Sequence, residues 1–216
     1  WSYDDATDTW TFVLRANAAF SNGDPVTSAD VVFSYGLWSA GFNFGGSFAQ
    51  VAGVEAVDAG DLPQDEADPQ GNRSRIFGAV NLVLDKGAVP ILIGGDDSLP
   101  IPMLEAYAAR GRTFTILQID AHIDWRDEVQ GERLGLSSTM RRASEMQHVE
   151  RIIQVGSRGI GSAREGDLAD ALAWGVQFVP AGEVARSGVW RAVDLIPDGA
   201  EVIICLDLDV LDPAIM

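Results

Sequence analysis

Three metal-seeking side chains follow one short apolar run near the middle of the sequence. The run is Phe114–Ile119, and the residues are Asp120, His122 and Asp124. Their spacing of two would put them on one face of an extended strand, and would group them around one point if the chain turned. Two carboxylates held close together cost free energy unless a positive charge lies between them. We therefore expect a divalent cation at this position.

Two further apolar runs end in acidic turns. Residues 91–93 lead into Gly94-Gly-Asp-Asp-Ser98, and residues 203–206 lead into Asp207-Leu-Asp-Val-Leu-Asp-Pro. A Gly-Gly-Asp turn alone is usually structural, but ligands bind beyond the carboxyl ends of strands in open parallel sheets. Three such ends would gather five carboxylates and one imidazole, which about two divalent cations would balance. Such oxygen-rich ligation suits Mn²⁺ better than structural Zn²⁺. The candidate metal ligands are Asp97, Asp120, His122, Asp124, Asp207 and Asp209.

The elements that must position these residues alternate between strands and helices from residue 74 onward. We expect helices at 76–84, 103–109, 138–146, 163–174 and 190–196, and strands at 89–93, 114–119, 152–155, 176–179 and 202–206. This alternation indicates βαβ units and a parallel sheet that is covered on both faces. The expected fold class is therefore α/β.

The first forty residues follow a different pattern. Residues 10–14 alternate as a strand would, and residues 31–35 follow a capping sequence that indicates the start of a helix. The stretch resembles a segment of the extracytoplasmic solute-binding proteins of peptide-type ABC importers. We therefore expect two parts, residues 1–40 and residues 41–216, with the first part arising from a natural fusion, an assembly error or a cloning join.

Composition narrows the possible partners. A net charge of −17 argues against nucleic-acid or anionic-membrane partners. No apolar run is long enough to span a bilayer and no signal peptide is present, so we expect a soluble, cytoplasmic protein. A single cysteine, Cys205, excludes an internal disulfide and is expected in the core. His148 is expected on the surface, and Arg141 and Arg142 on a solvated helix face.

Residues 41–216 resemble the ureohydrolase superfamily of arginases, agmatinases and guanidino-acid hydrolases, and are closest to the agmatinase branch. The resemblance implies an arginase-like three-layer α/β/α fold and two manganese ions. It also implies that a hydroxide bridging the ions attacks the guanidinium carbon of a small cationic or zwitterionic substrate and releases urea, a reaction of polyamine metabolism. The full-length family form is implied to be a homo-oligomer. The matching segments are VDAGDLP, PILIGGDDSLPIPML, ILQIDAHIDWRDE, RIIQVGSRGIGSA and ICLDLDVLDPA.

The resemblance also implies a role for each ligand. Asp120 and Asp207 would bridge the two ions. Asp124 would complete one site, and His122 with Asp209 would complete the other. Asp97 stands where the family has a histidine on the first metal, and an aspartate there is shorter, harder and negative.

Two other departures concern catalysis, for which no residue is assigned. Leu136 occupies the position of a family histidine that serves the substrate or a proton transfer. The chain begins at Trp1 and stops at Met216, before a late family glutamate that holds the guanidinium, so we expect a C-terminally truncated domain with impaired activity. Two alternatives stay open: a catalytically weak metal-binding relative, and a piece of a periplasmic peptide-binding protein.

Overall fold

The structure is a computed structural model. It describes residues 2–4, 7, 9–11, 26–27, 31, 59–159, 161 and 163–211. The chain divides into two compact units, which meet in the sequence between Leu92 and Ile93. Most of the strand expected at 10–14 and of the helix start expected at 31–35 lies outside the described residues.

The first unit contains a short antiparallel pair and a long helix. Strands β1 (Ser2–Asp4) and β2 (Thr9–Thr11) pair with each other, and helix α3 spans Pro69–Asp85. The helix begins seven residues before the expected start because Asp68 caps it, with its Oδ1 accepting a hydrogen bond of 2.8 Å from the backbone N–H of Gly71.

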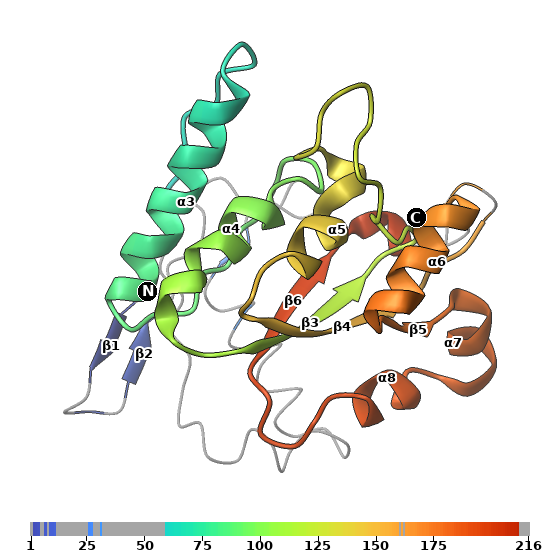
Figure 1. Ribbon diagram of the computed structural model, residues 1–216. Helices are drawn as coiled ribbons and strands as arrows, with labels where there is room; N and C mark the ends of the chain where they lie inside the picture. Colours follow the sequence, from blue (N-terminus) through green and yellow to red (C-terminus); the bar gives the residue numbers. More distant parts are fainter. Residues whose placement is uncertain are drawn as a thin grey trace. The chain divides into compact units, whose positions relative to one another are not determined.

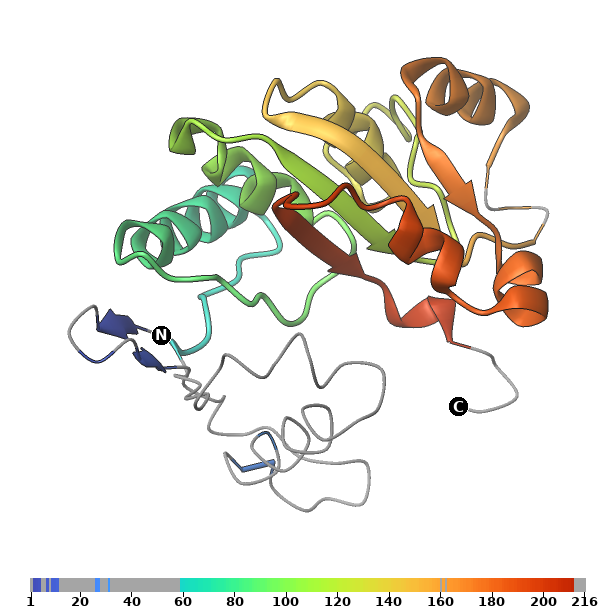
Figure 2. The ribbon, with the colours of Figure 1, turned by 90° about the horizontal axis from the view of Figure 1, so that it is seen from below.

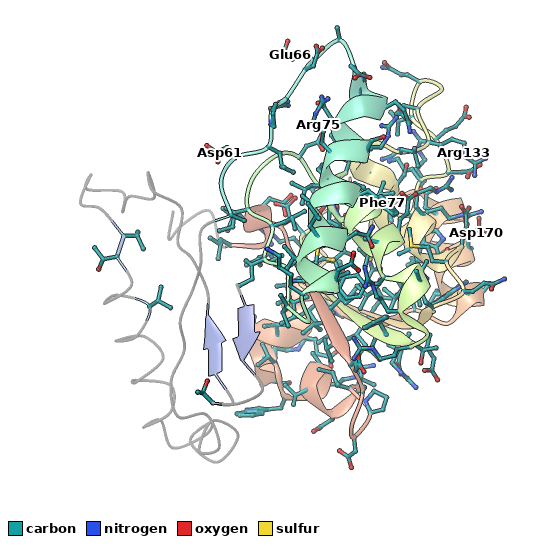
Figure 3. The ribbon with its side chains drawn as sticks, turned by 90° about the vertical axis from the view of Figure 1, so that its left-hand side faces the viewer. Asp61, Glu66, Arg75, Phe77, Arg133 and Asp170 are labelled. Atoms are coloured by element: carbon teal, nitrogen blue, oxygen red, sulfur yellow. The ribbon has the colours of Figure 1, made fainter. Side chains whose placement is uncertain are left out.

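Figure 3 places four labelled side chains of this unit. Asp61 and Glu66 lie in the segment before α3, and Arg75 and Phe77 lie on the helix itself. Phe77 is 42% exposed, so the apolar residues of α3 do not all lie on a buried face.

The prediction of a strand at residues 89–93 is wrong, because this segment has no regular secondary structure. Pro90 lacks the N–H that a strand pairing would use, and Ile91 and Ile93 are 68% and 76% exposed. An apolar run of five residues therefore did not suffice to identify a strand.

The second unit is built on a parallel four-stranded sheet in the order β5-β4-β3-β6. Figure 1 shows the strands side by side. The strands are β3 (Phe114–Ile119), β4 (Val149–Val155), β5 (Gln177–Val179) and β6 (Val202–Leu206). The expected bounds of β3 and β6 are confirmed, and β4 begins three residues before its expected start.

Five helices accompany the described sheet. They are α4 (Pro100–Ala106), α5 (Thr139–Ser144), α6 (Glu165–Trp174), α7 (Ala181–Ser187) and α8 (Trp190–Asp194). Figure 2 shows α5 and α6 on one side of the sheet and α7 and α8 on the other. The expected α/β fold with a parallel sheet is therefore confirmed. Helix α7 was missed because none of its residues is buried, so its sequence carries no apolar period.

The core on the α7 and α8 side of the sheet is a compact apolar cluster. Ile153 and Val155 of β4 and Val179 of β5 pack with Ala192 of α8, and all four are buried. The opposite face of the sheet is partly polar. Gln118 lies between Gln154 and Cys205 in the register of β3, β4 and β6, and all three are buried.

The strand order changes direction between β3 and β6. The chain runs from β3 to β4 to β5, then returns across the other face of the sheet so that β6 pairs with the free side of β3. In open α/β sheets, the crevice beyond the carboxyl ends of strands at such a switch point is where ligands bind. The acidic turns after β3 and β6 lie at this point.

No helix among the residues that the structure describes is long and apolar enough to cross a membrane.

Candidate metal centre

The chain turns immediately after β3, so the three residues of the central motif do not continue along one strand face. The backbone N–H of Asp120 donates to the carbonyl of Val155 at 2.9 Å, and this bond follows the last residue pair of β3 and β4. Asp124 has a φ of 46°, an uncommon value for a residue with a side chain. Its carbonyl accepts hydrogen bonds of 3.1 Å from the N–H groups of Met140 and Arg141, which hold the turn against α5.

Two groups of side chains at this point have donor atoms close enough to share a cation. One group is Asp120, His122 and Asp209, and the other is Asp97, Asp120 and Asp207. Within each group the donor atoms all lie within 4.8 Å of one another. Asp120 belongs to both groups, so one carboxylate lies between two candidate cation positions.

The first group is held by short contacts between the loops after β3 and β6. The Nδ1 of His122 lies 2.8 Å from Asp209 Oδ2 and 3.5 Å from Asp120 Oδ1. Asp209 Oδ1 also accepts a hydrogen bond of 3.1 Å from the backbone N–H of Ala121. Asp207 follows β6 directly, and its own N–H donates to the carbonyl of Ile119 at 3.0 Å.

Asp124 belongs to neither group, although its carboxyl is hydrogen-bonded to those of Asp97 and Asp120. Its Oδ2 accepts a hydrogen bond of 2.6 Å from Gln118 Nε2, and the same amide nitrogen donates to Asp120 Oδ2 at 2.8 Å. Gln118 in turn accepts a hydrogen bond from Gln154. This buried amide pair orients two of the carboxyl groups.

Neither of these two glutamines is among the site residues that the sequence pattern predicts. Both are about 1% exposed and lie on neighbouring strands in direct register. Gln154 also donates to the carbonyl of Ile123 at 2.8 Å. A polar residue inside each of two apolar runs was the only available signal.

Three carboxyl groups of the cluster, those of Asp97, Asp120 and Asp124, have raised pKa values. Burial, followed by the charges of Asp120 and Asp97, raises the pKa of Asp124 to about 11. Burial is also the main cause that raises the pKa of Asp97 to about 7, and the charges of Asp120 and Asp207 add to it. The pKa of Asp120 is raised as well, first by burial. All of these groups can be ionised near neutral pH only if a positive charge joins them.

The donor set fits a hard divalent cation. Asp97 has a buried oxygen, Oδ2, for which the described residues supply no hydrogen-bond partner. A buried and unpaired carboxylate oxygen is costly, and a cation would remove the cost. Carboxylate oxygens with one imidazole nitrogen are ligands that Mn²⁺ accepts.

A small pocket of about 150 Å³ lies beside the cluster. Its walls include His122 and Asp124 of the cluster together with Arg126, Ser137 and Asp167. A pocket of this size has room for water or for one small molecule. Leu136, at the position of the family histidine, is 51% exposed and is not among the residues that line it.

Three residues outside the cluster test other expectations. Cys205 is buried, as expected, and burial raises the pKa of its thiol to about 12, so it does not supply a thiolate. The prediction that His148 lies on the surface is wrong. This residue is 9% exposed, and its Nε2 lies 2.8 Å from the carbonyl of Leu104. The prediction that Arg142 lies on a solvated helix face is also wrong, because Arg142 is buried and pairs with Asp127 at 2.7 Å. Arg141 pairs at 2.9 Å with Asp170, which is 61% exposed and is labelled in Figure 3.

The fold and the cluster together define an α/β protein that gathers carboxylates and an imidazole at the switch point of a parallel sheet. The chain belongs to the arginase family, whose model matches residues 35–216. The match leaves most of the first forty residues uncovered, and their origin stays a prediction.

Relatives and solved structures agree with this assignment. The agmatinase of Bacillus subtilis is 28% identical over 164 residues, which are 76% of this chain and 54% of the agmatinase. The crystallised proclavaminate amidino hydrolase of Streptomyces clavuligerus is 29% identical, with a TM-score of 0.64, and is matched over 73% of this chain and 54% of that one. The formimidoylglutamase of Bacillus subtilis has the same fold, with a TM-score of 0.67 over 76% of this chain and 53% of that one, at 24% identity. The chain spans about half the length of these proteins.

Proposed function

We propose that the cluster binds two Mn²⁺ ions and that the protein hydrolyses a C–N bond of a small guanidino compound and releases urea. The observation that supports this most directly is the pair of ligand groups that share Asp120 at the switch point. The ligands are proposed to be Asp97, Asp120, His122, Asp124, Asp207 and Asp209.

Two of the carboxyl groups, those of Asp120 and Asp124, have defined tasks in this proposal. A pair of divalent cations lowers the pKa of water and so supplies a nucleophile at neutral pH. Asp120 lies between the two positions, and Gln118 holds it through a hydrogen bond of 2.8 Å. Asp124, which accepts a hydrogen bond of 2.6 Å from Gln118, would supply a further carboxylate ligand in its ionised form.

The substrate class comes from the names of the relatives. An agmatinase is among them, and a proclavaminate amidino hydrolase is among the matched structures. Both names indicate a small molecule with a guanidino or amidino group. A homo-oligomer, a place in polyamine metabolism and a cytoplasmic location, all expected from the sequence, belong to the same proposal.

A second candidate is a metal-binding relative with weak turnover. Two features favour it. Asp97 stands where the family has a histidine, and it brings an extra negative charge to the cations. Leu136 stands where the resemblance implies a histidine, and a leucine side chain cannot transfer a proton.

Metal binding is tested on the chain of residues 1–216. The chain is stripped with a chelator, titrated with Mn²⁺ by calorimetry and analysed for bound metal after gel filtration. We expect about two ions per chain. Asp120→Asn is expected to weaken the binding of both ions, because both ligand groups contain Asp120. The matched control is Asp194→Asn, at the end of α8 on the other side of the sheet, which should bind two ions.

Activity is tested by urea release from agmatine, 4-guanidinobutyrate and arginine at saturating Mn²⁺. We expect bound metal with slow or no turnover by residues 1–216, whose match covers 54% of the agmatinase of Bacillus subtilis. The absence of bound Mn²⁺ at millimolar concentrations would refute the metal centre. Rapid urea release by residues 1–216 would refute the second candidate and the expected impairment.

A further inference from the structure

Arg158 connects the two loops that carry the first ligand group. It follows β4 by three residues, in the turn after Gly156. Its guanidinium donates hydrogen bonds to three consecutive carbonyls of the loop after β6, those of Asp209 at 2.5 Å, Val210 at 2.8 Å and Leu211 at 2.8 Å. Its backbone N–H donates to the carbonyl of Ala121, in the loop after β3, at 2.9 Å.

The position of Asp209 depends on this connection more than that of Asp207 does. Asp207 is bonded to the carbonyl of Ile119 as a continuation of the β3–β6 ladder. Asp209 lies two residues further, in the 3₁₀ helix Leu208–Val210, which is beyond the ladder. Its contacts to Ala121 and His122 therefore require that the 3₁₀ helix be held against the loop after β3.

The packing beside Arg158 shows that the 3₁₀ helix Leu208–Val210 lies close to the loop after β3. A side chain at Gly156 would place its Cβ 2.4 Å from Val210 Cγ2 and 3.1 Å from the carbonyl oxygen of Asp120. The ends of β3, β4 and β6 thus approach one another without room for a methyl group. The side chain of Arg158 reaches the carbonyls of Asp209 and Val210 in the 3₁₀ helix beside this close approach.

An arginine suits this task better than a lysine. A guanidinium presents five N–H donors in a fixed plane, whereas an ammonium is a compact charge with three donors. Three carbonyls that follow one another around a turn point in different directions, and two nitrogens of the guanidinium reach all three. Hydrogen bonds from a charged donor are about twice as strong as neutral ones.

We propose that Arg158 is a positioning residue that sets the affinity of the cation held by Asp120, His122 and Asp209, without contacting that cation. The cation held by Asp97, Asp120 and Asp207 depends on it little, because the sheet ladder places Asp207. This role rests on the proposed function, since it concerns the cations that the cluster is proposed to bind.

The test compares Arg158→Gln and Arg158→Lys with the unchanged chain and with a control, Arg112→Gln. Arg112 is 55% exposed and pairs with Glu201 at the start of β3, at the opposite end of the sheet. Mn²⁺ is titrated by calorimetry, and electron paramagnetic resonance at low temperature reports whether bound ions are close enough to couple. Loss of residues that orient metal ligands usually costs 10–100-fold in metal affinity.

We expect two coupled ions in the unchanged chain and in the control. In Arg158→Gln one ion should keep its affinity, and the other should bind at least tenfold more weakly, with an uncoupled spectrum at substoichiometric Mn²⁺. Arg158→Lys should fall between the two, because it keeps the charge but not the plane of donors. A general loss of structure would instead weaken both ions together.

The outcomes separate the two proposals. If the unchanged chain binds no Mn²⁺, the metal centre itself is refuted, and the role of Arg158 with it. If the unchanged chain binds two ions but the Arg158 variants bind both as tightly, or lose both equally in a chain that melts at the same temperature, only the role of Arg158 is refuted. If Arg158→Gln does not fold, Arg158→Lys decides by the same criteria.

Discussion

Asp97→Asn is expected to stabilise the metal-free chain at pH 8 and to destabilise the chain that holds Mn²⁺. The Asp97 carboxyl is mostly buried, one of its oxygens has no hydrogen-bond partner among the described residues, and the charges of Asp120 and Asp207 lie near it. An asparagine has nearly the same shape and carries no charge. The substitution therefore removes the cost of a buried charge, but also removes a proposed metal ligand.

The magnitude follows from the pKa of Asp97, which rises from an ordinary 3.8 to about 7. One pKa unit corresponds to ~1.4 kcal/mol, so the rise amounts to about 4 kcal/mol. The folded chain binds the proton more tightly than the unfolded chain does. Below pH 4 the carboxyl is protonated in both states and costs nothing. Stability is then lost as the pH rises towards 7, and the full cost is present above it.

The assay is urea denaturation of chelator-treated protein at pH 4 and pH 8, and again at pH 8 with Mn²⁺ in excess. Asp97→Asn should add up to about 4 kcal/mol to the free energy of unfolding at pH 8 without metal, and almost nothing at pH 4. With Mn²⁺ at 100 times its dissociation constant the unchanged chain gains about 2.7 kcal/mol per ion, and the variant should gain less.

The control is Asp96→Asn, which alters the exposed neighbouring carboxylate. It should shift the free energy of unfolding by a few tenths of a kcal/mol at either pH, as surface substitutions usually do. The reasoning fails if Asp97→Asn is no more stable than the unchanged chain at pH 8 without metal, or if it gains as much at pH 4.

Four further outcomes are expected. Gln118→Leu should weaken Mn²⁺ binding 10–100-fold in calorimetry, because two carboxyl groups lose the amide that orients them; unchanged affinity would exclude that role. Arg126→Gln should weaken the binding of 4-guanidinobutyrate more than that of agmatine in competition assays, because the cation on the pocket wall suits a carboxylate; an equal effect on both ligands would contradict this. Gly156→Ala should lower the free energy of unfolding by at least about 2 kcal/mol in urea, given its φ of 101° and the contact with Val210, and a near-neutral result would disprove the close approach. Deletion of residues 1–40 should leave the number of bound Mn²⁺ ions unchanged by elemental analysis, and a loss of metal would show that the segment supports the site.

The sequence predicted the parts of this fold whose signals are local. Strands β3 and β6 have the bounds expected from their apolar runs, and their acidic turns meet because carboxyl ends of parallel strands share one edge. The segment at residues 89–93 has a similar apolar run and forms no strand, since pairing with a neighbour decides such cases. The order of the strands, and with it the switch point between β3 and β6, has no local signal at all.

The candidate site shows the same division. The six proposed ligands stand in three short motifs that could be found by their composition. Gln154 and Arg158 could not be identified, because each acts through a partner far away in the sequence. Gln118 acts on the nearby Asp120 and Asp124, but a glutamine inside an apolar run does not reveal that role. The role of Asp124 as a metal ligand stays a prediction, and its hydrogen bonds to Gln118 and to two other carboxyl groups had no signal in the sequence.

The distance along the chain between β3 and β6 has a consequence for the order of folding. Residues 115 and 202 pair in the sheet, and Ala121 bonds to Asp209 across 88 residues. Closing so long a loop has an entropic cost that nearer pairings do not have, so β3 and β4 are expected to associate before β6 joins them. A cation that needs both loops can then bind only after the slowest step. Mn²⁺ should therefore slow unfolding in stopped-flow experiments while leaving the refolding rate nearly unchanged.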